Sequence, residues 1–124
     1  MYLPALKNAR PASRYRVGNY LALIVTDCES IGMIQYTHVL FLLEIGQVQP
    51  IFAVAAEMNS MSLAGGETRL FLGVFSGHGH ENHGMSADWA DLDKFSARAL
   101  QIVAERYAIT EPPELLPLAN PSSN

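Results

Sequence analysis

The alternation of hydrophobic and polar positions predicts four β-strands in this chain, because side chains on a strand point to opposite faces with a period of two. The four stretches are residues 15–26, 36–45, 49–58 and 68–76. The centre of 36–45 is apolar on both faces, which is typical of a central strand. The connections after it are too short for a crossover helix, so we expect antiparallel pairing. Gly46 predicts a type II′ hairpin turn between the second and third strands.

A different period follows, because apolar residues recur every three or four positions and so predict one long helix. The predicted stripe consists of Trp89, Leu92, Phe95, Ala99, Ile102 and Val103. Ser86 or Asp88 is the expected cap, and Pro112 marks a position that the helix cannot pass. Together these elements predict an α+β fold: an antiparallel meander of about four strands with one long C-terminal helix packed on one face, as a two-layer sandwich.

Proline and small polar residues at the two ends divide the chain into three parts. Residues 1–14 are expected to be an irregular N-terminal arm, 15–110 a single α+β domain, and 111–124 a proline-rich flexible tail. Residues 27–35 fit either a short helical turn or a further strand.

The composition favours association between copies of the chain. Hydrophobic residues make up 49% of the sequence and charged residues only 16%, so apolar surface is expected to remain after the core has formed. Small domains commonly bury such surface in a homodimer. We therefore expect a non-enzymatic accessory or binding protein that acts as a homo-oligomer, with a further protein partner as a second option.

Charge and cysteine content exclude several other classes of protein. The net charge is −4 and no basic patch stands out, so nucleic-acid binding is not expected. Cys28 is the only cysteine, which rules out an intrachain disulfide, and we interpret it as a half-buried structural residue. The longest apolar run is far too short to span a bilayer. A cytoplasmic protein without membrane association is the resulting expectation.

Three of the four histidines fall within six residues, in what the sequence predicts to be a glycine-rich loop between the last strand and the helix. His78, His80 and His83 have the spacing H-x-H-x-x-H, and three neutral imidazoles plus water form a common catalytic zinc arrangement. Gly77, Gly79 and Gly84 would let the backbone wrap closely around an ion. These histidines are the candidate metal ligands; no cofactor is otherwise expected, and catalytic residues are not identified.

The spacing His78-x-His80-x-x-His83 is similar to the H-x-H-x-D-H signature of the metallo-β-lactamase-type hydrolases, which also follows a strand. That resemblance implies zinc and hydrolytic chemistry. It covers only six residues, with Asn82 at the position of the family's aspartate and no later histidine to supply its other ligands. A small zinc-type protein, with hydrolysis as a candidate reaction, is therefore the alternative functional hypothesis.

Other interpretations of the same residues are structural. The histidine segment also fits an ordinary polar connection or a pH-sensitive loop, which the sequence does not separate. An anion site is a weaker fit, because the glycines match no phosphate-binding spacing and Asp88 and Asp91 would repel an anion. His38 fits a hydrogen-bonded structural residue within a strand, and Glu57 fits an ordinary charge at a strand end or a group facing a pocket. A small-molecule pocket between sheet and helix is a third functional option.

Overall fold

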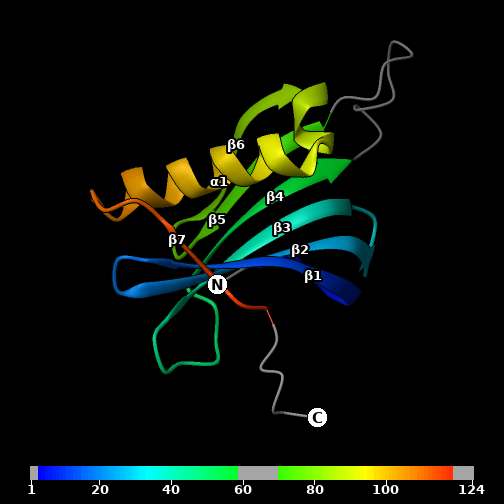
Figure 1. Ribbon diagram of the computed structural model, residues 1–124. Coiled ribbons are helices and arrows are strands. Elements are labelled where there is room, and N and C mark those ends of the chain that lie inside the picture. Colours follow the sequence, from blue (N-terminus) through cyan, green and yellow to red (C-terminus); the bar gives the residue numbers. More distant parts are fainter. Residues whose placement is uncertain (1–2, 59–69, 119–124) are drawn as a thin grey trace.

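The computed structural model describes residues 3–58 and 70–118 and has a seven-stranded antiparallel sheet with one α-helix along one face (Figure 1). The strand order across the sheet is β6-β5-β4-β3-β2-β1-β7. The elements are β1 (Leu6–Val17), β2 (Tyr20–Ser30), β3 (Gln35–Glu44), β4 (Phe52–Met58), β5 (Leu70–Ser76), β6 (Gly79–Ser86), a 3₁₀ turn (Ala87–Ala90), α1 (Leu92–Arg106) and β7 (Glu114–Leu116). The predicted α+β class, the meander and the single long helix are confirmed. The predicted number of strands, about four, is too low.

A two-residue turn explains why the sequence pattern predicted one strand where the structure has two, β1 and β2. The sequence stretch 15–26 reads as one apolar run, but it reverses at Gly18, whose φ of +59° is in the left-handed region that glycine adopts without strain. Val17 pairs with Tyr20 across this turn. Glycine at the first central position of a two-residue hairpin is the usual type II′ arrangement.

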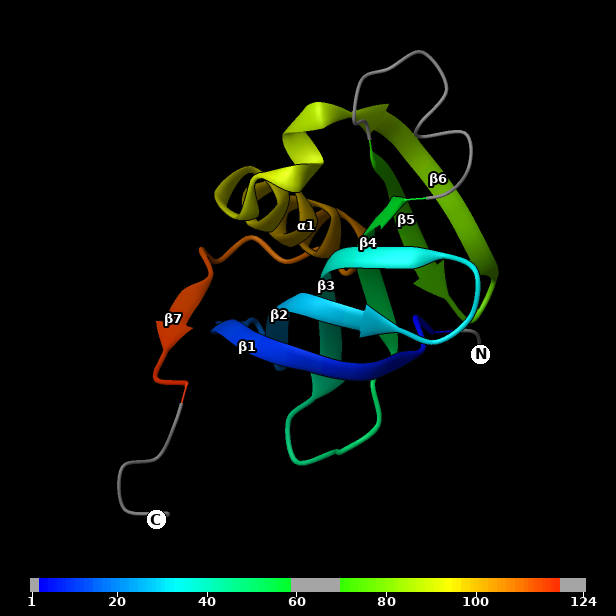
Figure 2. The same ribbon diagram turned by 90° about the vertical axis from the view of Figure 1, so that its right-hand side faces the viewer.

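The N-terminal arm is the second correction, because β1 begins at Leu6 and so occupies most of the segment expected to be irregular. Pro11 is tolerated there because β7 pairs only with residues 14–16 of β1, which leaves the outer side of the strand at Pro11 without a ladder partner. The proline-rich tail also contributes to the sheet, since Leu115 pairs with Tyr15. Figure 2 shows β7 beside β1.

The third correction concerns the histidine segment, which is an edge strand instead of a loop. Strand β6 pairs with β5 along its length: Gly79 pairs with Ser76 at one end and Ser86 with Leu70 at the other. One extra residue lies in β6 between Asn82 and Met85. The first residues of the predicted fourth strand, 68 and 69, lie outside the described residues. The sequence did not predict this strand, because the segment is rich in glycine and histidine, which do not have the high β-propensity of β-branched and aromatic residues.

The turn after β3 also differs from its prediction. The amide of Gln47 donates to the carbonyl of Glu44 at 3.0 Å, so Gly46 is the third residue of this turn. Its φ of +86° fits a type II turn, in which that position requires a positive φ.

The helix closes the core on one face, as the stripe predicts. Its buried side chains are Phe95, Ala99, Leu100, Ile102 and Val103, and they pack against alternate residues of β2, β3, β4 and β5. Neither expected residue caps α1: Ser86 caps the 3₁₀ turn, and Asp91 caps the helix by accepting from the amide of Lys94. Among residues 3–58 and 70–118, no helix is long and apolar enough to cross a membrane.

Candidate binding face

The sheet face opposite α1, called here the helix-free face, carries rows of apolar side chains on its central strands. Leu21 pairs with Leu43 and Leu23 with Phe41 across β2 and β3. All four side chains are only half-buried. The helix cannot reach them, because alternate residues of a strand point to the opposite side of the sheet.

The N-terminal residues cover a neighbouring part of this face. Leu3, Leu6 and Ala9 pack on a second buried cluster formed by Val25, Val39, Ala53, Ala55 and Phe75. The amide of Ile31 donates to the carbonyl of Ala5 at 3.0 Å, which ties this segment to the end of β2. Leu21 and Leu43 belong to neither buried cluster, so the apolar rows continue beyond the covered area.

A polar pair interrupts the apolar surface on this face. Nε2 of His80 on β6 lies 2.7 Å from Oε1 of Glu57 on β4, and the Glu57 side chain is only 4% exposed. The His80 ring stacks on Phe75, with centroids 4.4 Å apart and planes at 8°. The His80 side chain remains 41% exposed, so the pair presents one oriented imidazole to solvent while the carboxylate is hidden.

Gly73 makes this pair possible. It lies on β5, between the strands that carry the two partners, and pairs with Ala55 on one side and Asn82 on the other. A Cβ at Gly73 would collide with the carboxylate of Glu57 and would lie 2.8 Å from Nε2 of His80. The carboxylate and imidazole therefore meet in the space that any other residue would fill with its side chain.

A bulge in β3 brings Tyr36 to the same place. Tyr36 pairs with Glu57 and His38 with Ala56, so Thr37 is an extra residue in β3. The bulge turns Tyr36 onto the helix-free face, where its ring meets the edge of Phe75 with centroids 6.3 Å apart. Regular alternation would place Tyr36 and His38 on one face, as the sequence suggests, and the bulge separates them.

Burial and charge alter the acidity of these groups. Burial raises the pKa of Glu57 above its ordinary value of 4.5, while the charge and hydrogen bond of His80 act against that rise. The pKa of Tyr36 is also raised, first by burial and then by the nearby Glu57 charge. Tyr36 and Glu57 therefore both hold their protons more strongly on this face than they would in water.

We expect the stability of the protein to reflect the raised pKa of Glu57. The folded chain holds a proton that the unfolded chain releases above pH 4.5, so one part of the unfolding free energy is present at low pH and is lost as the pH rises through the folded-state pKa. Urea unfolding of wild type and Glu57→Gln across this range should show wild type losing stability relative to the variant. The opposite trend would mean that His80 lowers the pKa of Glu57 overall.

The structure separates the three histidines that the sequence groups. His78 lies in the turn before β6, beside Arg106 and Tyr107 at the end of α1. His80 faces Glu57, whereas Nε2 of His83 lies 3.0 Å from Glu81.

Within residues 3–58 and 70–118, no three His, Cys, Asp or Glu side chains are grouped to hold a metal ion. Zinc binding stays a prediction. Elemental analysis of tag-free protein tests it: about one ion per chain, lost in any histidine-to-alanine variant, would support a site.

The remaining histidine is structural. His38 is buried, and its Nε2 donates to the carbonyl of Ala90 at 2.9 Å. Its Nδ1 lies 2.8 Å from the hydroxyl of Thr26. Its two ring nitrogens thus join β3 to β2 and to the 3₁₀ turn. This agrees with the prediction that His38 is a hydrogen-bonded structural residue.

Cys28 does not have the character of a nucleophile. Burial, followed by the charge of Asp27, raises the pKa of its thiol to about 11. The thiolate is the reactive form of cysteine, so the side chain stays protonated and unreactive near neutral pH.

The pattern of apolar and polar residues does not reveal the role of Gly73 or the face on which Tyr36 lies. A glycine inside an apolar strand is a known sign of close approach, and it was the signal that could have found this site.

Comparison with known proteins adds no relative: no family model, no curated protein and no solved structure matches this chain.

Proposed function

We propose that this chain is a non-enzymatic binding protein that acts as a homo-oligomer, with two copies joined through their helix-free faces. The observation that carries the proposal is the pair of apolar rows formed by Leu21, Leu23, Phe41 and Leu43, which are half-buried and which α1 does not cover. Burying such side chains in a second copy is favourable by about 25 cal/mol for each Å² of apolar area removed from water.

The edges of the sheet support contact through faces over contact through edges. β6 has an extra residue beside Gly84, whose φ of +113° is left-handed, and it carries the charged Glu81. β7 at the other edge has only three residues. Bulges, charges and short edge strands all hinder strand pairing between molecules.

The surroundings of the apolar rows also resemble a protein interface. Arg14 and Arg16 of β1 pair with Leu23 and Leu21, so the two arginines lie beside the rows on the same face. Interfaces between proteins commonly have an apolar centre and a polar rim, with arginine enriched. Two sheets that pack face to face lie about 10 Å apart and interdigitate their side chains. A second copy of this chain supplies the complementary apolar surface.

Sedimentation equilibrium of the tag-free full-length chain tests the proposal. We expect a species of twice the 13.6 kDa chain mass, with dissociation on dilution. A single 13.6 kDa species at every concentration up to about 1 mM, a range that detects even weak self-association, would overturn it.

A further inference from the structure

A groove on the other side of the sheet separates β1 from α1. It has a volume of about 360 Å³. Its lining residues are Ala12, Ser13, Tyr15, Leu92, Asp93, Ser96, Ala97 and Leu100. Small residues face each other here from strand and helix, so the two elements cannot fill the space between them. The core beneath the rest of α1 is closed by large side chains such as Phe95 and Phe52.

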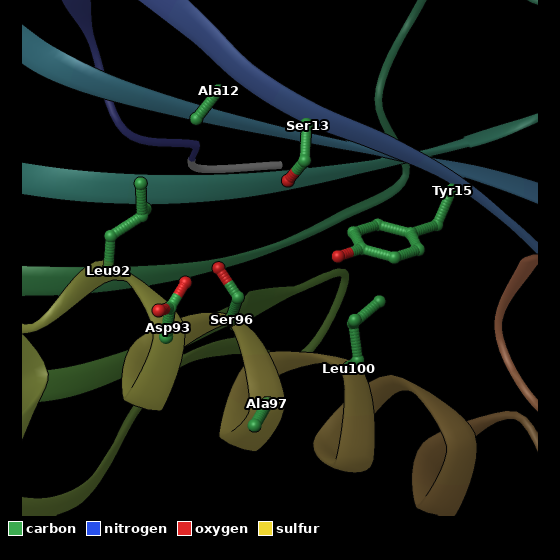
Figure 3. A pocket seen from close by; sticks show the side chains of 8 residues that line it. All are labelled: Ala12, Ser13, Tyr15, Leu92, Asp93, Ser96, Ala97 and Leu100. Atoms are coloured by element: carbon green, nitrogen blue, oxygen red, sulfur yellow. The ribbon is translucent and has the colours of Figure 1, made fainter. Parts of the chain in front are cut away.

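Polar groups converge on this groove. Figure 3 shows the hydroxyls of Ser13, Ser96 and Tyr15 and the carboxylate of Asp93 turned towards the space between strand and helix. Within residues 3–58 and 70–118, these four side chains have no hydrogen bond or ion pair with one another or with a neighbour. The nearby acids differ: Asp88 pairs with Lys94, and Asp91 caps the helix. The fold therefore leaves the polar groups of the groove available to a ligand.

The chemistry of these groups selects one class of ligand. A carboxylate only accepts hydrogen bonds and hydroxyls can accept them, so the matching group is a donor with a positive charge. A primary ammonium has three N–H donors and fits this set, whereas Asp93, the only formally charged side chain of the lining, would repel an anion. Leu92, Leu100 and the ring of Tyr15 offer an apolar wall for an alkyl chain, and the ring also attracts a cation.

We propose that the groove between β1 and α1 binds small primary alkylamines, with Asp93 and the hydroxyls of Ser13, Ser96 and Tyr15 around the ammonium group. This site lies on the helix side of the sheet, so it does not depend on the proposed dimer. Asp93 also stands in the first turn of α1, where a negative charge favours the helix. The experiment must therefore separate ligand binding from helix stability.

Titration of the labelled full-length protein with pentylammonium chloride, followed by amide chemical shifts, is the test. We expect saturable shifts at the amides of Ser13 and Ser96, with a dissociation constant on the order of 1 mM, as suits a ligand of so few atoms. Asp93→Asn should weaken binding at least about tenfold, because it removes the charge-assisted hydrogen bond. Tyr15→Phe and Ser96→Ala should weaken it less, and thermal unfolding verifies that each variant is folded.

Two controls make the result specific. Asp88→Asn removes an exposed carboxylate outside the groove and should leave pentylammonium binding unchanged. Tetramethylammonium has the charge but no N–H donor, and pentanol has the chain but no charge, so neither should saturate the site. The proposal is overturned if pentylammonium fails to saturate, if Asp93→Asn binds it as wild type does, or if tetramethylammonium binds equally well.

Discussion

Gly73→Ala is expected to destabilise the protein by about 3 kcal/mol, a large cost for adding one methyl group. The new Cβ would occupy the position of the Glu57 carboxylate and crowd Nε2 of His80. The carboxylate must then leave its partner or the strands must separate. The first outcome leaves a buried carboxylate without its hydrogen bond, and the second breaks the pairing of Gly73 with its neighbouring strands. Urea unfolding followed by circular dichroism measures the change.

A matched glycine and a double variant identify the cause. Gly77→Ala should be nearly neutral, because a Cβ there meets no atom within 4 Å and its φ is not left-handed. In a Glu57→Ala background the collision with the carboxylate disappears and only the close contact with the exposed His80 side chain remains, so Gly73→Ala should cost much less than it does in wild type. Equal costs in both backgrounds would contradict the proposed role of Gly73, since independent sites are additive.

Leu43→Glu is expected to convert the proposed dimer to a monomer. Leu43 lies in the apolar rows of the helix-free face but outside both buried clusters, so the variant should fold. Two carboxylates brought into one face-to-face contact would be desolvated and would repel each other. We expect the dimer dissociation constant to rise at least about a hundredfold, which corresponds to about 2.8 kcal/mol. Sedimentation equilibrium of wild type and variant at matched concentrations measures it.

Val48→Glu is the control for this substitution. Val48 is also apolar and is 84% exposed, but it lies in the loop between β3 and β4. The same change there should leave self-association unaffected. If Leu43→Glu remains a dimer, or if Val48→Glu dissociates equally, the contact does not run through the helix-free face, although the chain could still self-associate elsewhere.

The helix-free face illustrates how a local irregularity changes what a sequence pattern predicts. Period-two alternation correctly separated Phe41 and Leu43 from the core side of β3. It failed at Tyr36, because one extra residue at Thr37 reverses every side chain before it. A bulge has little sequence signal, since it depends on the register with the neighbouring strand.

The prediction that the histidine segment is a loop was wrong for a related reason. Its spacing gave three candidate ligands, but spacing along a chain says nothing about which face each side chain takes. Once β6 joins the sheet, His80 faces Glu57, which is 23 residues away, and His83 faces Glu81. The contact of His80 with Glu57 depends on strand pairing, which forms only with the whole sheet, whereas His83 and Glu81 both lie on β6.

The sequence by itself determined the α+β class, the meander, the helix and its buried stripe, because these depend on periodicity within short segments. The tertiary structure alone decided the seven-strand order, the Glu57–His80 pair over Gly73 and the groove beside Asp93. Each of those features joins residues from separate strands or from strand and helix. Their positions depend on register and packing between segments, for which no local periodicity carries the information.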